Sequence, residues 1–278
     1  MKFDKIEKSM DLCICTRFGF RYPFDKTVQL IKNAGFQSVM TWWGDEFIET
    51  DGLPKEKKPD IIRKNDLKLE NVHFPFGNIN NIWVDTLDGK VIFDKIIEYI
   101  HDCKIHEIPT AILHVSSGDN PPPFNQLGLD RFKKIIETSE KDNVNIALEN
   151  LRKPKYLENI FDNIQSDKLK FCYDSGHENC WAPNYDHLSK YGDKLIALHL
   201  HDNDGAIDQH LLPFNGTIDW KKIMHKIKDT NYSGPLALEI YAQYIDVSKE
   251  YTAEEYLIEA KNRTCRLINI LHETTDLG

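Results

Sequence analysis

Residues 144–149 read Val-Asn-Ile-Ala-Leu-Glu, and a helical pattern over residues 154–164 follows them. A short apolar run that leads into apolar residues at three- to four-residue spacing is typical of a strand followed by a helix. The same alternation continues in both directions along the chain. Strands are expected at residues 12–16, 38–42, 69–73, 110–115, 144–149, 170–174, 195–199 and 236–240. Helices are expected at about residues 25–34, 91–100, 127–141, 154–164, 219–228 and 253–271.

Eight strands with helices between them predict an α/β fold, a parallel sheet closed into a (β/α)8 or TIM barrel. The rival is a doubly wound open sheet, which more often has five or six strands and a glycine-rich turn after the first. Residues 17–21 read Arg-Phe-Gly-Phe-Arg, without a GxGxxG pattern, so the barrel is favoured. No linker, repeat or low-complexity tract interrupts the sequence, and residues 1–278 are predicted to form a single domain.

The composition is that of an ordinary globular protein, with 41% hydrophobic and 28% charged residues and a net charge of −9. No apolar run approaches the roughly 20 residues that cross a bilayer. The charged residues 1–8 contain no signal-peptide segment. The six cysteines form no CxxC pair and are expected to be free thiols, with Cys13 and Cys15 buried on a strand. We therefore expect a cytoplasmic protein without a membrane partner.

Six consecutive predicted strands end in an imidazole or a carboxylate. In chain order these residues are His73, His114, Glu149, Asp174, His199 and Glu239. The C-terminal ends of parallel strands converge on one rim of a barrel, so these side chains are expected to share one space. Unpaired buried carboxylates are strongly penalised, whereas a divalent metal ion would neutralise them and also accept imidazole ligands. The pattern predicts a metal site at this rim.

Other residues near the strand ends have more open roles. His177 places an additional imidazole just past the sixth strand, and His201 is expected to point away from His199. Loops over residues 74–89 and 202–217 are expected to border the site. Two roles are open for Trp42, Trp43 and Phe74: they form apolar walls of the site or simply pack in the barrel. Two roles are also open for Arg17, Arg21 and Arg152: they bind an anionic group of the substrate or form surface ion pairs. The remaining histidines are expected on helix surfaces, namely His101, His106, His187, His225 and His272.

With these residues in place, the chain resembles the xylose-isomerase-like barrel superfamily, which contains sugar isomerases, sugar epimerases and endonuclease IV. The resemblance covers nearly the whole chain and depends on the order of several short motifs, each weak alone. The motifs are Val72-His73, Leu113-His114, Leu148-Glu149-Asn150, Tyr173-Asp174-Ser175-Gly176-His177, His199-Leu200-His201-Asp202, Asp208-Gln209-His210, Gly216-Thr217-Ile218-Asp219-Trp220 and Leu238-Glu239.

Similarity to the ketose epimerases implies one catalytic ion of manganese, magnesium, cobalt or zinc. Its implied ligands are Glu149, Asp174, His199 and Glu239. In that chemistry Glu149 and Glu239 shuttle a proton through an enediolate, and His177 holds a substrate oxygen. Similarity to endonuclease IV implies instead up to three zinc ions. The matching positions are His73, His114, Glu149, Asp174, His177, His199, Asp208, His210 and Glu239. A loop that contacts substrate or caps the site is the alternative for Asp208 and His210.

Three functions are therefore weighed. The first is a divalent-metal-dependent isomerase or epimerase of a small sugar or sugar phosphate, and the second is a multinuclear zinc phosphodiesterase that cleaves abasic DNA or another phosphate ester. The third is a binding or regulatory protein without turnover, which a full ligand set disfavours. Residues 74–89 and 202–217 contain no lysine or arginine, so nucleic acid is not the expected partner and the first function is favoured. Barrels of this superfamily often pair, so a homodimer stays open.

Overall fold

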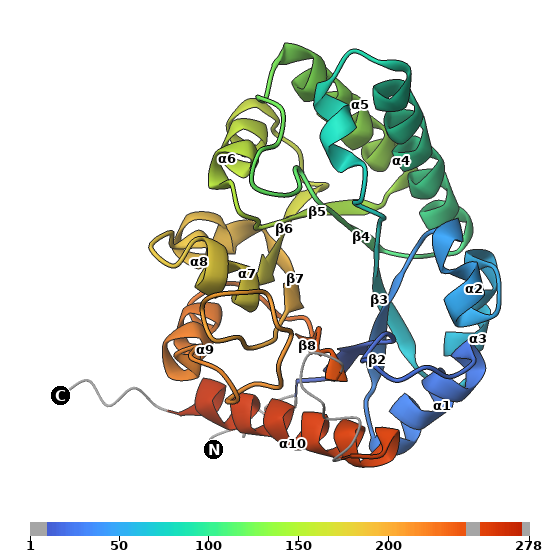
Figure 1. The fold of residues 1–278 in the computed structure, drawn as a ribbon, viewed down its shortest axis with the longest axis vertical. Coiled ribbons are helices and arrows are strands. Elements are labelled where there is room, and N and C mark those ends of the chain that lie inside the picture. The colour runs from blue at the N-terminus through green and yellow to red at the C-terminus, as the bar shows by residue number, and fades with distance from the viewer. Residues whose placement is uncertain (1–9, 243–250, 274–278) are drawn as a thin grey trace, which may run out of the picture.

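The computed structural model describes residues 10–242 and 251–273. Within them, eight parallel strands form one sheet in the order β7-β6-β5-β4-β3-β2-β1-β8 (Figure 1). The strands are β1 Leu12–Cys15, β2 Ser38–Trp42, β3 Lys68–His73, β4 Thr110–Leu113, β5 Asn145–Glu149, β6 Leu169–Asp174, β7 Leu195–His199 and β8 Leu236–Leu238. The predicted strand ranges differ from these bounds by no more than two residues at either end.

The two edge strands, β7 and β8, meet and close the barrel. Leu200, the residue after β7, forms an isolated parallel bridge with Leu238 at the end of β8. The Leu200 amide donates to the Ala237 carbonyl at 2.9 Å, and the Glu239 amide donates to the Leu200 carbonyl at 3.1 Å. This seam is shorter than the ladders between the other strands, but it completes the ring, and the predicted (β/α)8 barrel is confirmed.

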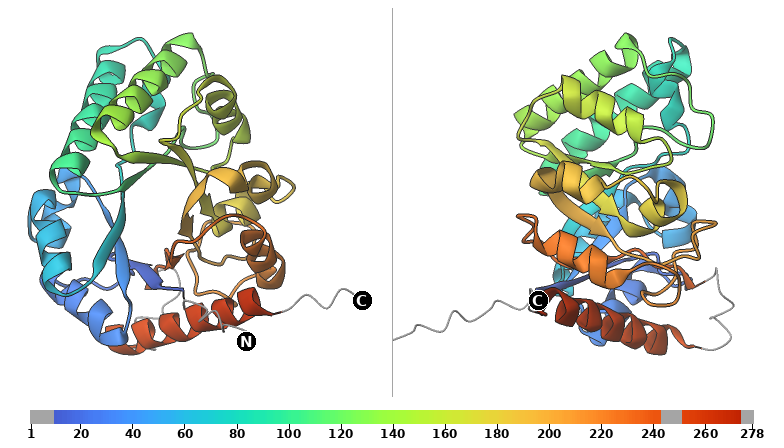
Figure 2. Two further views of the ribbon diagram at one scale, coloured as in Figure 1. Left: turned by 180° about the vertical axis from the view of Figure 1, so that it is seen from behind. Right: turned by 90° about the vertical axis from the view of Figure 1, so that its left-hand side faces the viewer.

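Helices connect successive strands and lie on the outside of the ring (Figures 1 and 2). They are α1 Phe24–Ala34, α2 Ile48–Asp51, α3 Lys58–Lys64, α4 Leu87–Ile105, α5 Gln126–Asp142, α6 Pro154–Asn163, α7 Ser175–Trp181, α8 His187–Tyr191, α9 Trp220–Lys228 and α10 Ala253–His272. The last helix packs against α1 and α9, so the two ends of the barrel's chain cover neighbouring strands. None of the helices in the described ranges has the length and apolar character that a membrane crossing requires.

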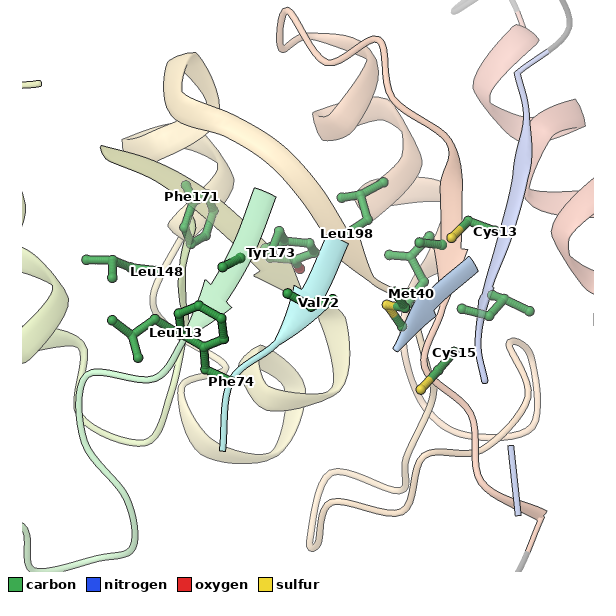
Figure 3. Close-up of a cluster of buried hydrophobic side chains, with 14 of the residues drawn as sticks. Cys13, Cys15, Met40, Val72, Phe74, Leu113, Leu148, Phe171, Tyr173 and Leu198 are labelled. Carbon is green, nitrogen blue, oxygen red and sulfur yellow. The ribbon is translucent and has the colours of Figure 1, made fainter. Parts of the chain in front are cut away.

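In β4 to β7, strand alternation separates two sets of buried side chains. One set packs into the large core that includes helix residues; Figure 3 shows some of its members, among them Leu113, Leu148, Phe171 and Leu198. The other set is a small separate cluster of Ile112, Ala147, Cys172 and Ala197. Because side chains two residues apart share a face of a strand, the residues that follow this small cluster along the same face are His114, Glu149, Asp174 and His199. The barrel interior thus forms an apolar floor beneath the expected site.

Cysteine burial agrees with the sequence-based expectation. Cys13 and Cys15 are fully buried on β1, and burial raises the pKa of the Cys15 thiol to about 12. All six cysteines are free thiols. They are spread over strands and helices; four are buried, Cys180 is partly buried and Cys265 is exposed.

Candidate metal-binding and active site

The six strand-end residues predicted from the sequence meet at one rim, and all are buried. Four of them are the last residues of β3, β5, β6 and β7, and the other two directly follow β4 and β8. In order they are His73, Glu149, Asp174, His199, His114 and Glu239. The convergence follows from the parallel register, which for example sets Asp174 beside His199.

The Glu149 carboxylate lies at the centre of this group. Its Oε2 atom is 3.1 Å from Nε2 of His73 and 2.9 Å from Nε2 of His114, and its Oε1 atom is 3.0 Å from Nδ1 of His199. Burial alone would raise the pKa of Glu149, but the contacts with His199 and His114 lower this pKa well below its usual range. The carboxylate is therefore held ionised among imidazoles.

A second carboxylate contacts the same imidazole from the neighbouring strand. Oε2 of Glu239 is 3.1 Å from Nδ1 of His199, and although burial opposes it, His199 lowers the pKa of Glu239. Glu149, Asp174, His199 and Glu239 each offer a ligand atom, all within 4.8 Å of one another. Three buried carboxylates around one imidazole, whose Nδ1 atom faces Glu149 and Glu239, carry more negative charge than that imidazole balances. This donor set fits a divalent cation.

The loop after β7 brings a further group of ligand-type side chains to the rim. Oδ2 of Asp208 is 3.3 Å from Nε2 of His177 and 3.3 Å from Nε2 of His210. His177 is buried and His210 is partly buried. Although burial opposes it, Asp174 and Asp208 raise the pKa of His177 to about 10, and Asp208 raises that of His210 to about 9. The nine positions implied by the resemblance to endonuclease IV therefore lie together.

His201 also belongs to the site, contrary to the sequence-based expectation. It lies two positions after His199, with only Leu200 between them, and strand alternation places such a pair on the same face rather than on opposite faces. Its Nε2 atom is 3.0 Å from Oδ1 of Asp174 and 3.6 Å from Oδ1 of Asp208, and the ring is fully buried. The ring stacks on His210 with centroids 4.0 Å apart. The signal in the sequence that identifies His201 is its even spacing from His199, because residues at even spacing in an extended chain share a face.

Gly176 makes room for the His201 ring. A Cβ atom at this position would lie 1.9 Å from Cε1 of His201, so only glycine fits without a shift. Ser175 fixes the same neighbour from the backbone: its hydroxyl donates to the His201 carbonyl at 2.7 Å and accepts from the His201 amide at 3.0 Å. The Ser175-Gly176 pair thus positions the start of α7 against the strand end of β7.

The carboxylate of Asp202, the first residue of the acidic loop over residues 202–217, holds this loop in place. Asp202 is fully buried and accepts hydrogen bonds from Nε1 of Trp220 at 2.8 Å, from the Phe214 amide at 2.9 Å and from the Ile218 amide at 3.2 Å. Asp202 is therefore a structural acceptor and does not add charge to the cavity. The loop that it closes carries Asp208 and His210 to the rim.

Aromatic rings stack on several of the site's imidazoles. The ring centroids are 4.3 Å apart for Trp42 and His73, 4.2 Å for Phe76 and His114, and 4.2 Å for Trp181 and His177. Trp42, Phe76 and Trp181 also line a cavity of about 470 Å³ above the carboxylates. Trp42 therefore forms an apolar wall, as one of its two interpretations proposed.

Several sequence-based expectations for neighbouring residues are wrong or resolved. Trp43 and Phe74 are fully buried in the core, so packing is their role, and Phe76, in the loop after β3, supplies the wall instead. Arg152 lines the cavity, whereas Arg17 and Arg21 line a separate hollow. His187 is not on a helix surface: it is fully buried, with its Nδ1 atom 2.6 Å from Oε2 of Glu178.

The fold and the site define a TIM-barrel protein with an imidazole–carboxylate centre at the C-terminal rim of its strands. Residues 28–261 match the model of the xylose isomerase-like TIM barrel family. The chain belongs to that family, as the resemblance of its motifs predicted.

The names of similar proteins include uncharacterised proteins, an endonuclease and sugar 3-epimerases. An uncharacterised protein, y4fM, of Sinorhizobium fredii is 45% identical over 145 residues, which is 47% of this chain and 47% of that protein, so the match spans about half of either. The probable endonuclease 4 of Mycoplasma mycoides is 28% identical over 234 residues, 73% of this chain and 78% of that protein.

Solved structures share the fold at low sequence identity. A D-tagatose 3-epimerase-like protein superposes with a TM-score of 0.75 at 18% identity, covering 94% of this chain and 98% of that chain. Further matches in sequence and structure are also named as sugar 3-epimerases, and one solved structure, of IOLI protein, has a bound zinc atom. Sugar 3-epimerases thus occur among both the sequence relatives and the structural neighbours, together with an endonuclease.

Proposed function

We propose that this protein is a divalent-metal-dependent isomerase or epimerase that acts on a small sugar or sugar derivative. The observation that carries the proposal is that two ionised carboxylates, Glu149 and Glu239, contact one imidazole, His199, and both line a cavity of small-molecule size. The cavity, about 470 Å³, is within the range of small-ligand pockets. The sugar 3-epimerases among the similar proteins support the same class.

The residues of the site divide into metal holders and proton carriers. Glu149, Asp174, His199 and Glu239 would hold the metal ion, which when bound would polarise a substrate carbonyl and acidify the adjacent C–H bond. Glu149 and Glu239 face the cavity, and their lowered pKa values keep both in the basic form that accepts a proton from carbon. One carboxylate would remove the proton from carbon, and the other, once it has taken up a proton from solvent, would return a proton to the opposite face of the enediolate.

His177 and the aromatic walls would position the substrate. The His177 ring lines the cavity between the Glu149 and Asp208 carboxylates, and its raised pKa makes it a hydrogen-bond donor to a substrate oxygen. Trp42 and Phe76 offer apolar faces against which the carbon chain of a sugar can lie. The cavity thus has polar groups beneath and flat rings beside the proposed ligand.

The second candidate function is a multinuclear zinc phosphodiesterase. It is favoured by Asp208, which contacts both His177 and His210 and so completes a ligand set larger than one ion requires. The relative named as a probable endonuclease 4 aligns with 73% of the chain. The cavity, however, suits a small molecule, and Arg152 is the only lysine or arginine that lines it among the described residues.

Two measurements decide between these functions. Metal analysis of protein purified without added metals is expected to find about one ion per chain, whereas close to three zinc ions, together with cleavage of duplex DNA at an abasic site, would favour the phosphodiesterase. For the isomerase, we expect solvent deuterium to enter a ketose from a panel of free and phosphorylated ketoses.

The substitution Glu239→Gln is expected to stop this exchange, because an amide cannot accept the proton. The matched control Glu137→Gln changes an exposed helix residue and should exchange normally. Thermal unfolding of both variants checks that the fold survives. Continued exchange in Glu239→Gln would show that Glu239 is not a proton carrier.

A further inference from the structure

The cavity contains one cationic side chain that the proposed chemistry does not use. Among the described residues, Arg152 is the only lysine or arginine lining it, alongside the carboxylates of Glu149, Asp208 and Glu239. The chain as a whole has a net charge of −9. A guanidinium placed at the mouth of such a cavity creates a local site where an anion is attracted rather than repelled.

Aromatic stacking fixes Arg152 relative to the reacting centre. Its guanidinium carbon lies 3.9 Å from the centroid of the Trp181 ring, and the same indole stacks on His177, with centroids 4.2 Å apart. Trp181 follows His177 by four residues on α7, so both rings lie on one face of the helix. The stack therefore connects Arg152 in a defined position to an imidazole that contacts Glu149.

The guanidinium edge has donors to spare. In the described part of the chain, Arg152 donates one hydrogen bond, from Nη1 to Oδ1 of Asp119 at 3.3 Å, and Asp119 is 76% exposed. Stacking uses the face of the guanidinium and leaves its in-plane N–H groups available, and this planar fork matches the two oxygens of a carboxylate or phosphate. Lys153 and Lys155, both exposed, adjoin Arg152 in a neighbouring surface hollow and add to the positive potential.

We infer that Arg152 forms an anion subsite for a phosphate or carboxylate group at the end of the substrate remote from the reacting carbon atoms. The inference rests on the proposed function, because it places a sugar in this cavity, and it deepens that function by naming a charged rather than a neutral sugar as the substrate. Arg152 then determines specificity and takes no part in proton transfer.

The test compares three ligands that differ only at one carbon: fructose, fructose 6-phosphate and fructuronate. Their affinities for the metal-loaded protein are measured by calorimetry for the wild type, Arg152→Gln, Arg152→Lys and the control Arg21→Gln, whose arginine lines a different hollow. A hydrogen-bonded charge pair corresponds to about a tenfold to hundredfold preference for a charged ligand. We expect this preference in the wild type and control, its loss in Arg152→Gln with fructose binding unchanged, and a partial loss in Arg152→Lys.

A comparison of the affinities for fructose 6-phosphate and fructuronate identifies which anion the subsite prefers. Inorganic phosphate is a fourth probe, read out by the tryptophan fluorescence change that it causes; the change should disappear in Trp181→Phe and in Arg152→Gln. Equal binding of all three sugars by the wild type, an equal loss for all three in Arg152→Gln, or no response to phosphate and both charged sugars would overturn the inference. Deuterium exchange reports the proposed function separately: an Arg152-dependent preference without exchange would support the subsite and reject the isomerase.

Discussion

The contact between Gly176 and His201 predicts a large effect of a single methyl group. In Gly176→Ala the new Cβ would lie 1.9 Å from Cε1 of His201, whereas ordinary contacts begin at 3.4 Å, so ring and helix have to separate by about 1.5 Å. The ring cannot easily move, because it is fully buried, stacks on His210 and has its backbone bound to Ser175.

Two energies of opposite sign compete in this substitution. Alanine favours a helix over glycine by about 1 kcal/mol, whereas overpacking a rigid interior costs about 1–3 kcal/mol. With a ring held on several sides we expect the clash to prevail and the free energy of unfolding to fall by about 2 kcal/mol. Metal affinity should fall roughly tenfold to a hundredfold, as is typical when a residue that positions ligands is disturbed.

Urea unfolding of four proteins tests the reasoning: the wild type, Gly176→Ala, His201→Ala and the double variant. Once the ring is removed, the methyl group should be tolerated and stabilise the protein by up to about 1 kcal/mol, so the sign of the effect changes between backgrounds. Gly77→Ala, which has open space within 4 Å, is the control and should stay within about 0.5 kcal/mol of the wild type. If Gly176→Ala is as stable as the wild type, the described placement of His201 is wrong.

Three further predictions concern the surroundings of the site. Asp202→Asn should lower the free energy of unfolding by about 3 kcal/mol, since the amide turns a donor toward the Trp220 indole and the loop amides; circular dichroism in urea measures this, and an unchanged midpoint would contradict it. Glu178→Gln should cost about 1–3 kcal/mol through its contacts with His187 and Tyr173, without altering metal content; loss of the metal would reveal a direct role. Chelation should lower the melting temperature, because an ion present at 100 times its dissociation constant stabilises the folded state by about 2.7 kcal/mol; an identical melting curve after verified metal removal would argue against the proposed metal site.

The strand ends were predictable because barrel geometry turns a simple sequence pattern into proximity. Glu149 and Glu239 are 90 positions apart, yet both directly end or follow strands, and parallel register brings them to one rim. His201 shows how such reasoning can fail. The strand was assigned correctly, but His201 was expected on the face opposite His199, and a residue of the site was therefore excluded. The signal was present in the spacing from His199.

Other features depend on packing that no local pattern reports. Trp42 and Trp43 are adjacent and chemically identical, but one stacks on His73 at the cavity and the other is buried and donates from Nε1 to Asp102 on α4 at 3.1 Å. Whether Trp42 or Trp43 faces the cavity depends on which face of β2 each side chain occupies, and the sequence alone sets the strand position only to within a residue. The burial of His187 likewise requires Glu178, nine residues away, to fold back against α8.

The short seam between β7 and β8 couples closure of the ring to its chemistry. Two hydrogen bonds, through Leu200 and the Glu239 amide, join these strands, and His199 and Glu239 stand directly beside them on either side. A cation bound by both side chains would link β7 to β8 at the place where the two backbone hydrogen bonds join these strands. Metal binding would therefore make transient opening between β7 and β8 less frequent. The amide protons of Leu200 and Glu239 would then exchange more slowly with solvent.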